Sequence, residues 1–281
     1  MTRPHSPESV SQSPIVIYGA PRSGTTYLVD LLNSHPEVFV SNEVRIFTWA
    51  HHALKSLPSD ERFLVSHRER FIEHLKGVLR AEIPSFYQTL APHAQHWGDK
   101  NPHYSDPRDA GCLDTIRELF PSARFVHLIR DGRDVAASLL QQRNEDGRPW
   151  VDFAQAHWTW RAHLDVGLAF GASLPSAQYA ELRYEELVKS DEEVSRRLFS
   201  HLGIVYHDKV TRYCAEQQIR RTPLSSPSRD LAVGTLVSRW STAFTPEQQL
   251  LSLDIIASHL VSLGYATQEW VNRTRERLST R

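Results

Sequence analysis

The 281-residue chain has little cysteine, almost no net charge and no long apolar run. Its two cysteines, Cys112 and Cys214, are too few for a disulfide framework, which favours a reducing compartment. Thirty-two basic and thirty-three acidic side chains leave a formal net charge of −1, so the composition indicates no nucleic-acid partner. No stretch approaches the roughly 18 apolar residues of a membrane span. From these absences we expect a cytoplasmic protein without a membrane span.

The N-terminal residues 1–14 combine several serines and prolines and have no apolar core. We therefore interpret them as a mobile tail and not as a secretory signal peptide. The remaining residues, 15–281, show neither an internal repeat nor a clear domain boundary. We expect them to form a single domain.

Short apolar runs alternate with helical patterns along much of the chain. The runs that predict strands are 15–18, 124–129 and 177–182, and the patterns that predict the helices after them are 25–33, 133–143 and 184–202. Such alternation is typical of an α/β fold, in which helices cover both faces of a mostly parallel sheet. Ligands of these folds bind beyond the carboxyl ends of the strands, which here are residues 19–24 and 130–134.

Other segments depart from this alternation. Amphipathic or apolar patterns predict further helices over 61–80, 150–170 and 247–263, and proline and serine predict an irregular loop over 220–238. We expect the largely helical insertion 46–96, together with the aromatic segment 150–170, to shape the acceptor side of the molecule.

The first strand is followed by Gly19-Ala-Pro-Arg-Ser-Gly-Thr-Thr26. Glycines in such a loop allow a tight turn with inward N–H groups, and the following helix N-terminus adds positive charge, so the loop predicts an anion site. The spacing matches nucleotide-binding phosphate loops except that Thr25 replaces the lysine. That replacement argues against ATP or GTP hydrolysis. Arg22 supplies positive charge inside the loop instead.

The second predicted strand is followed by Arg130-Asp-Gly-Arg-Asp-Val-Ala-Ala-Ser138. Arg130 leaves the strand end, and Ser138 lies two turns into the next helix. Both can face the crevice with Arg133 nearby, an arrangement that suits a second phosphate. The alternative is an ion pair between Arg130 and Asp131 with only a structural role.

Taken together, these motifs resemble those of sulfotransferases that use 3′-phosphoadenosine 5′-phosphosulfate (PAPS) and release 3′-phosphoadenosine 5′-phosphate (PAP). The spelling of the first loop is most similar to tyrosylprotein-type and related bacterial sulfotransferases. The resemblance implies a sulfotransferase-like, P-loop-containing α/β fold. It also implies that the loop residues Arg22, Ser23, Gly24, Thr25 and Thr26 hold the 5′-phosphosulfate. Arg130 and Ser138 would then hold the 3′-phosphate.

The same resemblance assigns catalytic roles. Glu43 stands where tyrosylprotein-type enzymes carry their catalytic Glu, and it would take the proton of an acceptor hydroxyl. Lys100, in Trp-Gly-Asp-Lys-Asn-Pro, and Arg22 would offset charge on the leaving group during in-line displacement. His103 is the rival base, because the cytosolic enzymes use a histidine shortly after their lysine. We expect Glu43 to be the base.

Weaker correspondences lie later in the chain. The resemblance places Tyr184 near the nucleotide and Arg239 at a late basic position that reaches the cofactor. A transition-state serine would be either Ser225 or Ser226, and the sequence does not choose between them.

The histidines form no HExxH motif and the cysteines no CxxC pair, so we expect no metal. The expected acceptor is a hydroxyl on a small metabolite, lipid or glycan, and the resemblance is compatible with a homodimer. Two alternative functions stay open. One is a P-loop nucleotide kinase or NTPase that lacks the lysine, and the other is a non-catalytic nucleotide-binding module.

Overall fold

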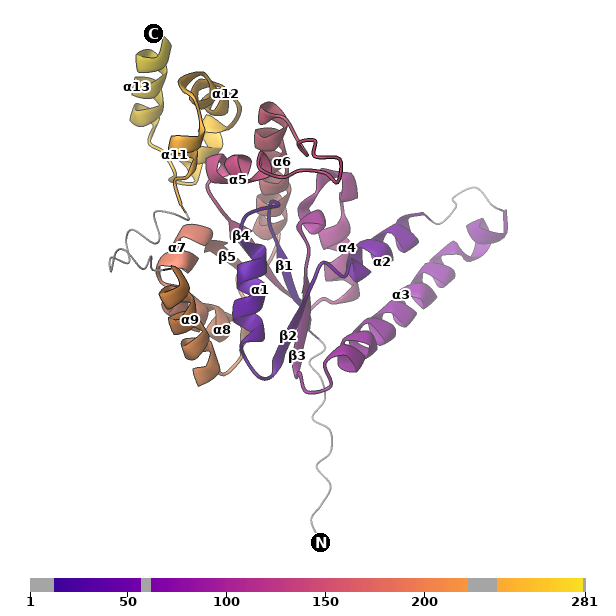
Figure 1. The fold of residues 1–281 in the computed structure, drawn as a ribbon. Helices are drawn as coiled ribbons and strands as arrows, with labels where there is room; N and C mark the ends of the chain where they lie inside the picture. The colour runs from indigo at the N-terminus through magenta and orange to yellow at the C-terminus, as the bar shows by residue number, and fades with distance from the viewer. Residues whose placement is uncertain (1–12, 57–61, 222–236, 280–281) are drawn as a thin grey trace.

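The computed structural model describes residues 13–56, 62–221 and 237–279, which form a central sheet with helices on both sides (Figure 1). The candidate serines 225 and 226 lie outside the described residues. In chain order the strands are β1 (Ile15–Tyr18), β2 (Val38–Asn42), β3 (His96–Lys100), β4 (Arg124–Ile129) and β5 (Tyr179–Arg183).

The helices fall into three groups. Those in the first half are α1 (Thr25–Asn33), α2 (Ile46–Lys55), α3 (Arg62–Leu90), the short 3-10 turns η1 (Pro102–Ser105) and η2 (Pro107–Asp109), and α4 (Cys112–Leu119). The central ones are α5 (Gly132–Leu139), α6 (Phe153–Ala172), α7 (Tyr184–Lys189), α8 (Asp191–Leu202) and α9 (Asp208–Arg221). The last are α11 (Trp240–Ala243), α12 (Pro246–Ser262) and α13 (Gln268–Ser279).

The expected parallel sheet is confirmed. Its strand order is β2-β3-β1-β4-β5, and each neighbouring pair is parallel. The chain runs from β1 to β2 on one side and later from β3 to β4 on the other. The order therefore changes direction beside β1, which is where α/β sheets place their ligands.

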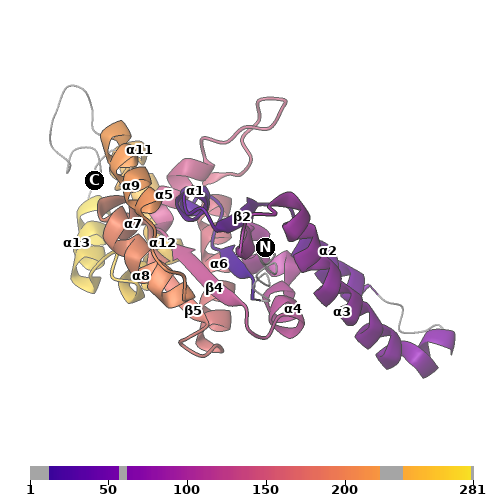
Figure 2. The same ribbon diagram turned by 90° about the horizontal axis from the view of Figure 1, so that it is seen from below.

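The central strand β1 has side chains buried in both faces of the sheet. Ile15 and Ile17 belong to the apolar cluster formed with α1, α7, α8 and α9, whereas Val16 and Tyr18 belong to the cluster formed with α2, α3 and α4. This opposite placement follows from the two-residue repeat of a strand. The two views show α2 and α3 projecting together from the sheet (Figures 1 and 2).

A third cluster joins α5 and α6 to the C-terminal helices. Trp160 lies at its centre with 1% of its surface exposed, and its indole nitrogen donates a hydrogen bond of 3.0 Å to the Arg130 carbonyl oxygen. The C-terminal helices therefore pack beside the end of β4, which the sequence marks as a binding site.

Several elements differ from those expected, and the expected helix 184–202 is divided into α7 and α8. Strands β2 and β3 were not predicted, because their polar residues interrupt the apolar pattern. Helix α5 ends at Leu139 and not near residue 143, since the chain turns back through a loop closed by a bridge between Arg143 and Pro149. Helix α3 continues ten residues past the expected end at 80 and contains Pro84.

Gly98 in β3 provides a test of the packing between β3 and β1. A Cβ atom at this position would lie 2.0 Å from the Ile15 carbonyl oxygen. Because that oxygen belongs to the backbone of the central strand, we expect Gly98→Ala to lower the free energy of unfolding by at least about 2 kcal/mol in urea denaturation.

Gly77, in the exposed part of α3, is the matched control because a Cβ there meets nothing within 4 Å. Gly77→Ala should raise the free energy of unfolding by roughly 0.5–1 kcal/mol. Equal effects of the two substitutions would contradict the close approach of β3 to β1.

Candidate active site

Four strand ends meet at one edge of the sheet. The segments that leave them are residues 19–24 after β1, 43–45 after β2, 101 after β3 and 130–131 after β4. The sequence predicted the first and the last of these segments as sites. The unpredicted strands β2 and β3 bring Glu43 and Lys100 to the same edge, because Asn42 and Lys100 are direct partners in the ladder.

The loop of residues 19–24 is shaped to receive an anion. Gly24, with φ 91°, is the N-cap of α1 and gives it no side-chain cap, and Arg22 also has a positive φ of 71°. The Ser23 hydroxyl is buried and has no hydrogen-bond partner among the described residues. Uncapped N–H groups and a buried hydroxyl are the donors that a phosphate or sulfate needs.

Arg130 and Ser138 lie against this loop. The Arg130 guanidinium donates a hydrogen bond of 3.1 Å to the Arg22 carbonyl oxygen, and Arg22 Nε donates one of 3.1 Å to the Ser138 hydroxyl. Tyr184 completes the group, since its ring lies 4.4 Å from Arg130 Cζ. A Cβ at Gly24 would lie 2.3 Å from the Tyr184 ring, so only glycine fits between them. The two predicted anion sites are therefore adjacent.

The sequence suggested that Arg133 joins this group, but in the structure it does not. Its guanidinium forms a two-pronged pair with Asp131, with contacts of 2.6 and 2.9 Å, and donates a further bond of 3.0 Å to the Tyr265 carbonyl oxygen. Asp131 therefore pairs with Arg133, which corrects the alternative of an Arg130–Asp131 pair. A guanidinium has five donors in a planar fork, so these contacts orient it away from the loop.

Glu43 and Lys100 form an ion pair. Lys100 Nζ lies 2.7 Å from Glu43 Oε1, and the Glu43 N–H donates a bond of 2.8 Å to the Lys100 carbonyl oxygen. The Lys100 side chain is only 2% exposed, whereas 42% of the Glu43 side chain is exposed. The Lys100 ammonium is thus buried, whereas the Glu43 carboxylate is accessible to a molecule in solution.

A buried carboxylate lies directly beside this pair. Asp99 accepts hydrogen bonds from the hydroxyls of Ser41 and Tyr104, and Ser41 is also within 2.9 Å of the Tyr87 hydroxyl. Burial raises the pKa of Asp99 to about 6, although these hydrogen bonds act in the opposite direction. The network ties β2, β3, η1 and α3 together beneath Glu43 and Lys100.

His103, the rival base, faces other acids. Its Nδ1 lies 3.6 Å from Asp106 Oδ2 and 3.7 Å from Asp109 Oδ2. Burial raises the pKa of Asp106, but hydrogen bonds from Arg108 outweigh this effect and lower the pKa to about 2. His103 therefore lies beside an ionised carboxylate rather than within the Glu43–Lys100 pair.

Asn101 was not predicted as a site residue. It is fully buried at the end of β3, and its N–H donates a bond of 3.0 Å to the Ile17 carbonyl oxygen of β1. Its side-chain Nδ2 has no partner among the residues described. The sequence signal that could have identified Asn101 as a site residue was its position immediately after Lys100.

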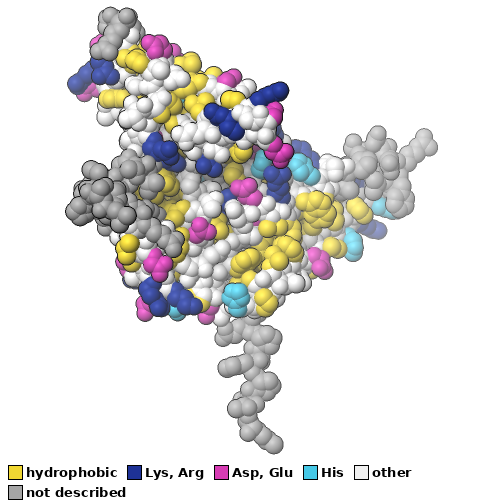
Figure 3. All heavy atoms as spheres, in the orientation of Figure 1, with side chains coloured by type: hydrophobic (Ala, Val, Ile, Leu, Met, Phe, Trp, Pro, Cys, Tyr) yellow, Lys and Arg dark blue, Asp and Glu magenta, His cyan; other side chains and the backbone are white. Residues whose placement is uncertain are grey.

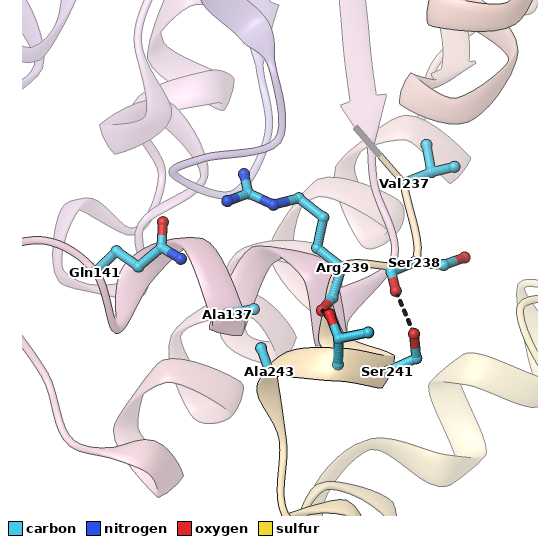
Figure 4. A pocket seen from close by; sticks show the side chains of 8 residues that line it. Ala137, Gln141, Val237, Ser238, Arg239, Ser241 and Ala243 are labelled. Atoms are coloured by element: carbon cyan, nitrogen blue, oxygen red, sulfur yellow. Dashed lines mark hydrogen bonds between the residues drawn. The ribbon is translucent and has the colours of Figure 1, made fainter. Parts of the chain in front are cut away.

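Arg239 lies at the far side of the site, where it lines a cavity of about 490 Å³ together with Ala137 of α5, Gln141 just beyond that helix and residues 241–243 of α11. Its guanidinium extends away from its own backbone toward the loop between β1 and α1 (Figure 4). Arg239 is thus in a position to contact a ligand that occupies the loop. Among the described residues, no cluster of three or more His, Cys, Asp or Glu could hold a metal ion.

Comparison with known proteins identifies the class. A family model for the sulfotransferase family matches residues 14–208, and the chain belongs to that family. Protein-tyrosine sulfotransferase A of Caenorhabditis elegans is 29% identical over 89% of this chain and 67% of the relative. The protein-tyrosine sulfotransferase of Drosophila melanogaster is 28% identical over 89% of this chain and 51% of the relative. The chain thus spans two thirds of one relative and about half of the other.

Solved structures show the same fold at low identity. The sulfotransferase domain from the curacin biosynthetic pathway superposes with a TM-score of 0.56 and 17% identity, covering 96% of this chain and 99% of that one. Mouse sulfotransferase SULT7A1, solved in complex with PAP, gives 0.54 and 12%, covering 97% and 91%. The expected sulfotransferase fold and enzyme class are therefore confirmed.

The expected cytoplasmic location is wrong in the light of these relatives. They are protein-tyrosine sulfotransferases, which are enzymes of Golgi membranes. Within the described ranges, no helix has the length and apolar character needed to cross a membrane.

Asp99 generates a testable pH dependence. A pKa of about 6 in place of the ordinary 3.8 means that the folded protein binds this proton more tightly than the unfolded chain. The contribution of Asp99 to the free energy of unfolding should then fall by about 3 kcal/mol as the pH rises through this interval.

Asp99→Asn removes that titration while it keeps a hydrogen-bonding side chain. Urea unfolding between pH 4 and 7 should show that the wild type loses roughly 2–3 kcal/mol relative to Asp99→Asn. Parallel stability curves for the two proteins would contradict the buried, titrating carboxylate.

Proposed function

We propose that this enzyme transfers the sulfuryl group of PAPS to an acceptor hydroxyl. The observation that carries the proposal is the union of two anion sites through the Arg22–Ser138 bond and the Arg130–Arg22 bond. A ligand with two separate phosphate groups would use both sites, whereas ATP would leave the second site unexplained. The mouse neighbour solved with PAP lends support from the same fold.

The residues present fit such a ligand. PAPS supplies the sulfuryl group when bound, and its 5′ end would lie against Arg22, the buried Ser23 hydroxyl and the N–H groups of Gly24, Thr25 and Thr26. Its 3′-phosphate would lie between Arg130 and Ser138. Tyr184 would contact the nucleotide beside Gly24, and Arg239 would approach from α11.

Glu43 is the proposed general base. Its carboxylate is open to solvent, so an acceptor hydroxyl can donate its proton there as the bond to sulfur forms. Lys100 is buried and paired with Glu43, and its charge would stabilise the oxygen that leaves sulfur. Arg22 would act with it, and the Asn101 amide offers a further donor. The transfer is proposed as an in-line displacement, with the acceptor and the leaving oxygen on opposite sides of sulfur.

The acceptor surface carries apolar side chains. Val44 is 42% exposed next to Glu43, and Trp49 is 62% exposed one turn into α2. On this face apolar side chains gather over α2 and α3 (Figure 3). A phenol ring would pack well against such a surface. The names of the curated relatives point the same way, so we propose a tyrosyl hydroxyl in place of the small metabolite, lipid or glycan.

Thermal unfolding with ligands tests the cofactor. A ligand at about 100 times its Kd adds roughly 2.7 kcal/mol to the free energy of unfolding. For a chain of this size the Tm should rise by about 5–10 °C with PAP, and Arg130→Ala should abolish the rise. A rise with Mg-ATP alone would reject the sulfotransferase mechanism and favour a nucleotide kinase.

Substitution of Glu43 tests the base. Glu43→Gln keeps an oxygen for Lys100 but cannot take a proton, so kcat for transfer to tyrosine-containing peptides should fall about 10²–10⁴-fold. The Kd for PAP, measured by calorimetry, should change less than about threefold, because Glu43 faces the acceptor. His103→Ala is the control and should keep most of kcat. The opposite pattern would make His103 the base.

A further inference from the structure

The Arg130-Asp-Gly-Arg-Asp motif contains two residues that the proposed chemistry does not use. Asp134 lies in the first turn of α5 and is 1% exposed, and Arg133 is 5% exposed. Neither side chain faces the loop after β1. Buried charged groups require partners, and besides the Arg133–Asp131 pair both residues have partners about one hundred residues later in the chain.

Asp134 binds the backbone on both sides of Arg239. Its Oδ2 accepts a hydrogen bond of 2.7 Å from the Ser238 N–H, and its Oδ1 accepts one of 3.0 Å from the Trp240 N–H. One carboxylate thus holds the amides that flank a single residue. Hydrogen bonds to a charged group are about twice as strong as those between neutral groups.

The segment that Asp134 holds is conformationally costly. Ser238 has a φ of 59°, in the left-handed region that residues other than glycine avoid. Such a conformation costs on the order of 1–3 kcal/mol and persists only where surrounding contacts maintain it. The bond from Ser238 N–H to Asp134 is a contact that maintains it here.

Arg133 holds the same segment through a side chain. Its guanidinium stacks 4.0 Å from the Trp240 ring and 5.2 Å from the Trp270 ring. The bidentate pair with Asp131 fixes the orientation of that guanidinium. The start of α11 is therefore held through its backbone by Asp134 and through its indole by Arg133.

The residue between the two held amides is Arg239. Its guanidinium crosses the cavity bounded by Ala137 and Gln141 toward the loop between β1 and α1 (Figure 4). We infer that Asp134 is a positioning residue, which sets Arg239 over the anion site without touching the cofactor itself. This inference rests on the proposed function, because it takes Arg239 as a ligand of PAPS.

The residues of this motif thus contact two different parts of the protein. Arg130 and Ser138 face the loop after β1, whereas Arg133 and Asp134 bind the start of α11. The same short helix would contact the cofactor through Ser138 and also orient a distant arginine toward it.

A double-mutant cycle on the full chain tests the inference, with the Kd for PAP measured by calorimetry. Arg239→Ala removes a charged ligand group and should weaken PAP binding about 10- to 100-fold. Asp134→Ala should weaken it to a similar degree. Asp134→Asn keeps one acceptor oxygen and should weaken it less. The double variant Asp134→Ala/Arg239→Ala should bind within about threefold of Arg239→Ala, because both changes remove the same contact.

Other outcomes distinguish failure of the positioning role from failure of the proposed function. If the losses of the single variants multiply in the double variant, or if either single variant binds like the wild type, the positioning role is rejected. If the wild type itself does not bind PAP, the proposed function fails instead.

Asp152→Ala is the matched control, since Asp152 caps α6 through an equivalent bond of 2.8 Å to the Gln155 N–H. This substitution should remove a helix cap worth about 1 kcal/mol of stability and leave the Kd for PAP unchanged.

Hydrogen exchange of the protein without ligand supplies a second readout. The Ser238 and Trp240 amides should exchange at least about tenfold faster in Asp134→Ala than in the wild type and remain unchanged in Asp152→Ala. Equal exchange in the wild type and Asp134→Ala would overturn the inference even if PAP binding were weakened.

Discussion

A buried ammonium group needs a carboxylate, and this requirement organises the reactive end of the sheet. Lys100 is 1% exposed at the last position of β3, and Glu43 meets it from the end of β2. The pair depends on the parallel register of the two strands, which aligns Asn42 with Lys100. The Asp99 network beneath the pair holds that register by binding Ser41 of β2 from β3. The contacts that position the proposed catalytic pair are therefore also contacts that pack the sheet.

The other half of the site depends on contacts between segments far apart in the chain. Arg22 reaches Ser138 across 116 residues, and Asp134 reaches Trp240 across 106. Both contacts involve α5, so this eight-residue helix connects the loop after β1 with the C-terminal part of the protein. A short buried helix suits that task because its side chains have little freedom to move.

The proposed role of Asp134 changes how the motif after β4 is understood. As sequence, Arg130-Asp-Gly-Arg-Asp looks like a single cluster of charges around one phosphate. In the structure Asp131 and Arg133 neutralise each other, while Arg130 lies against the Arg22 carbonyl oxygen and the Tyr184 ring. Charges close together in the sequence thus serve different partners, because Arg130 precedes α5 whereas Arg133 and Asp134 lie in its first turn and point in different directions.

The sequence by itself determined the local elements with strong patterns: the apolar run of β1, the loop of residues 19–24 and the strand-to-helix step at Arg130. These depend on near neighbours along the chain, so periodicity and glycine spacing are enough to predict them. Strands β2 and β3 were missed, because residues such as Asp99 and Lys100 conceal a strand whose burial comes from its neighbours. Only the tertiary structure decided that Glu43 pairs with Lys100, that Arg133 leaves the crevice and that Asp134 holds the segment around Arg239. Each of these results depends on which distant group pairs with a buried charge, and the local sequence pattern does not predict that partner.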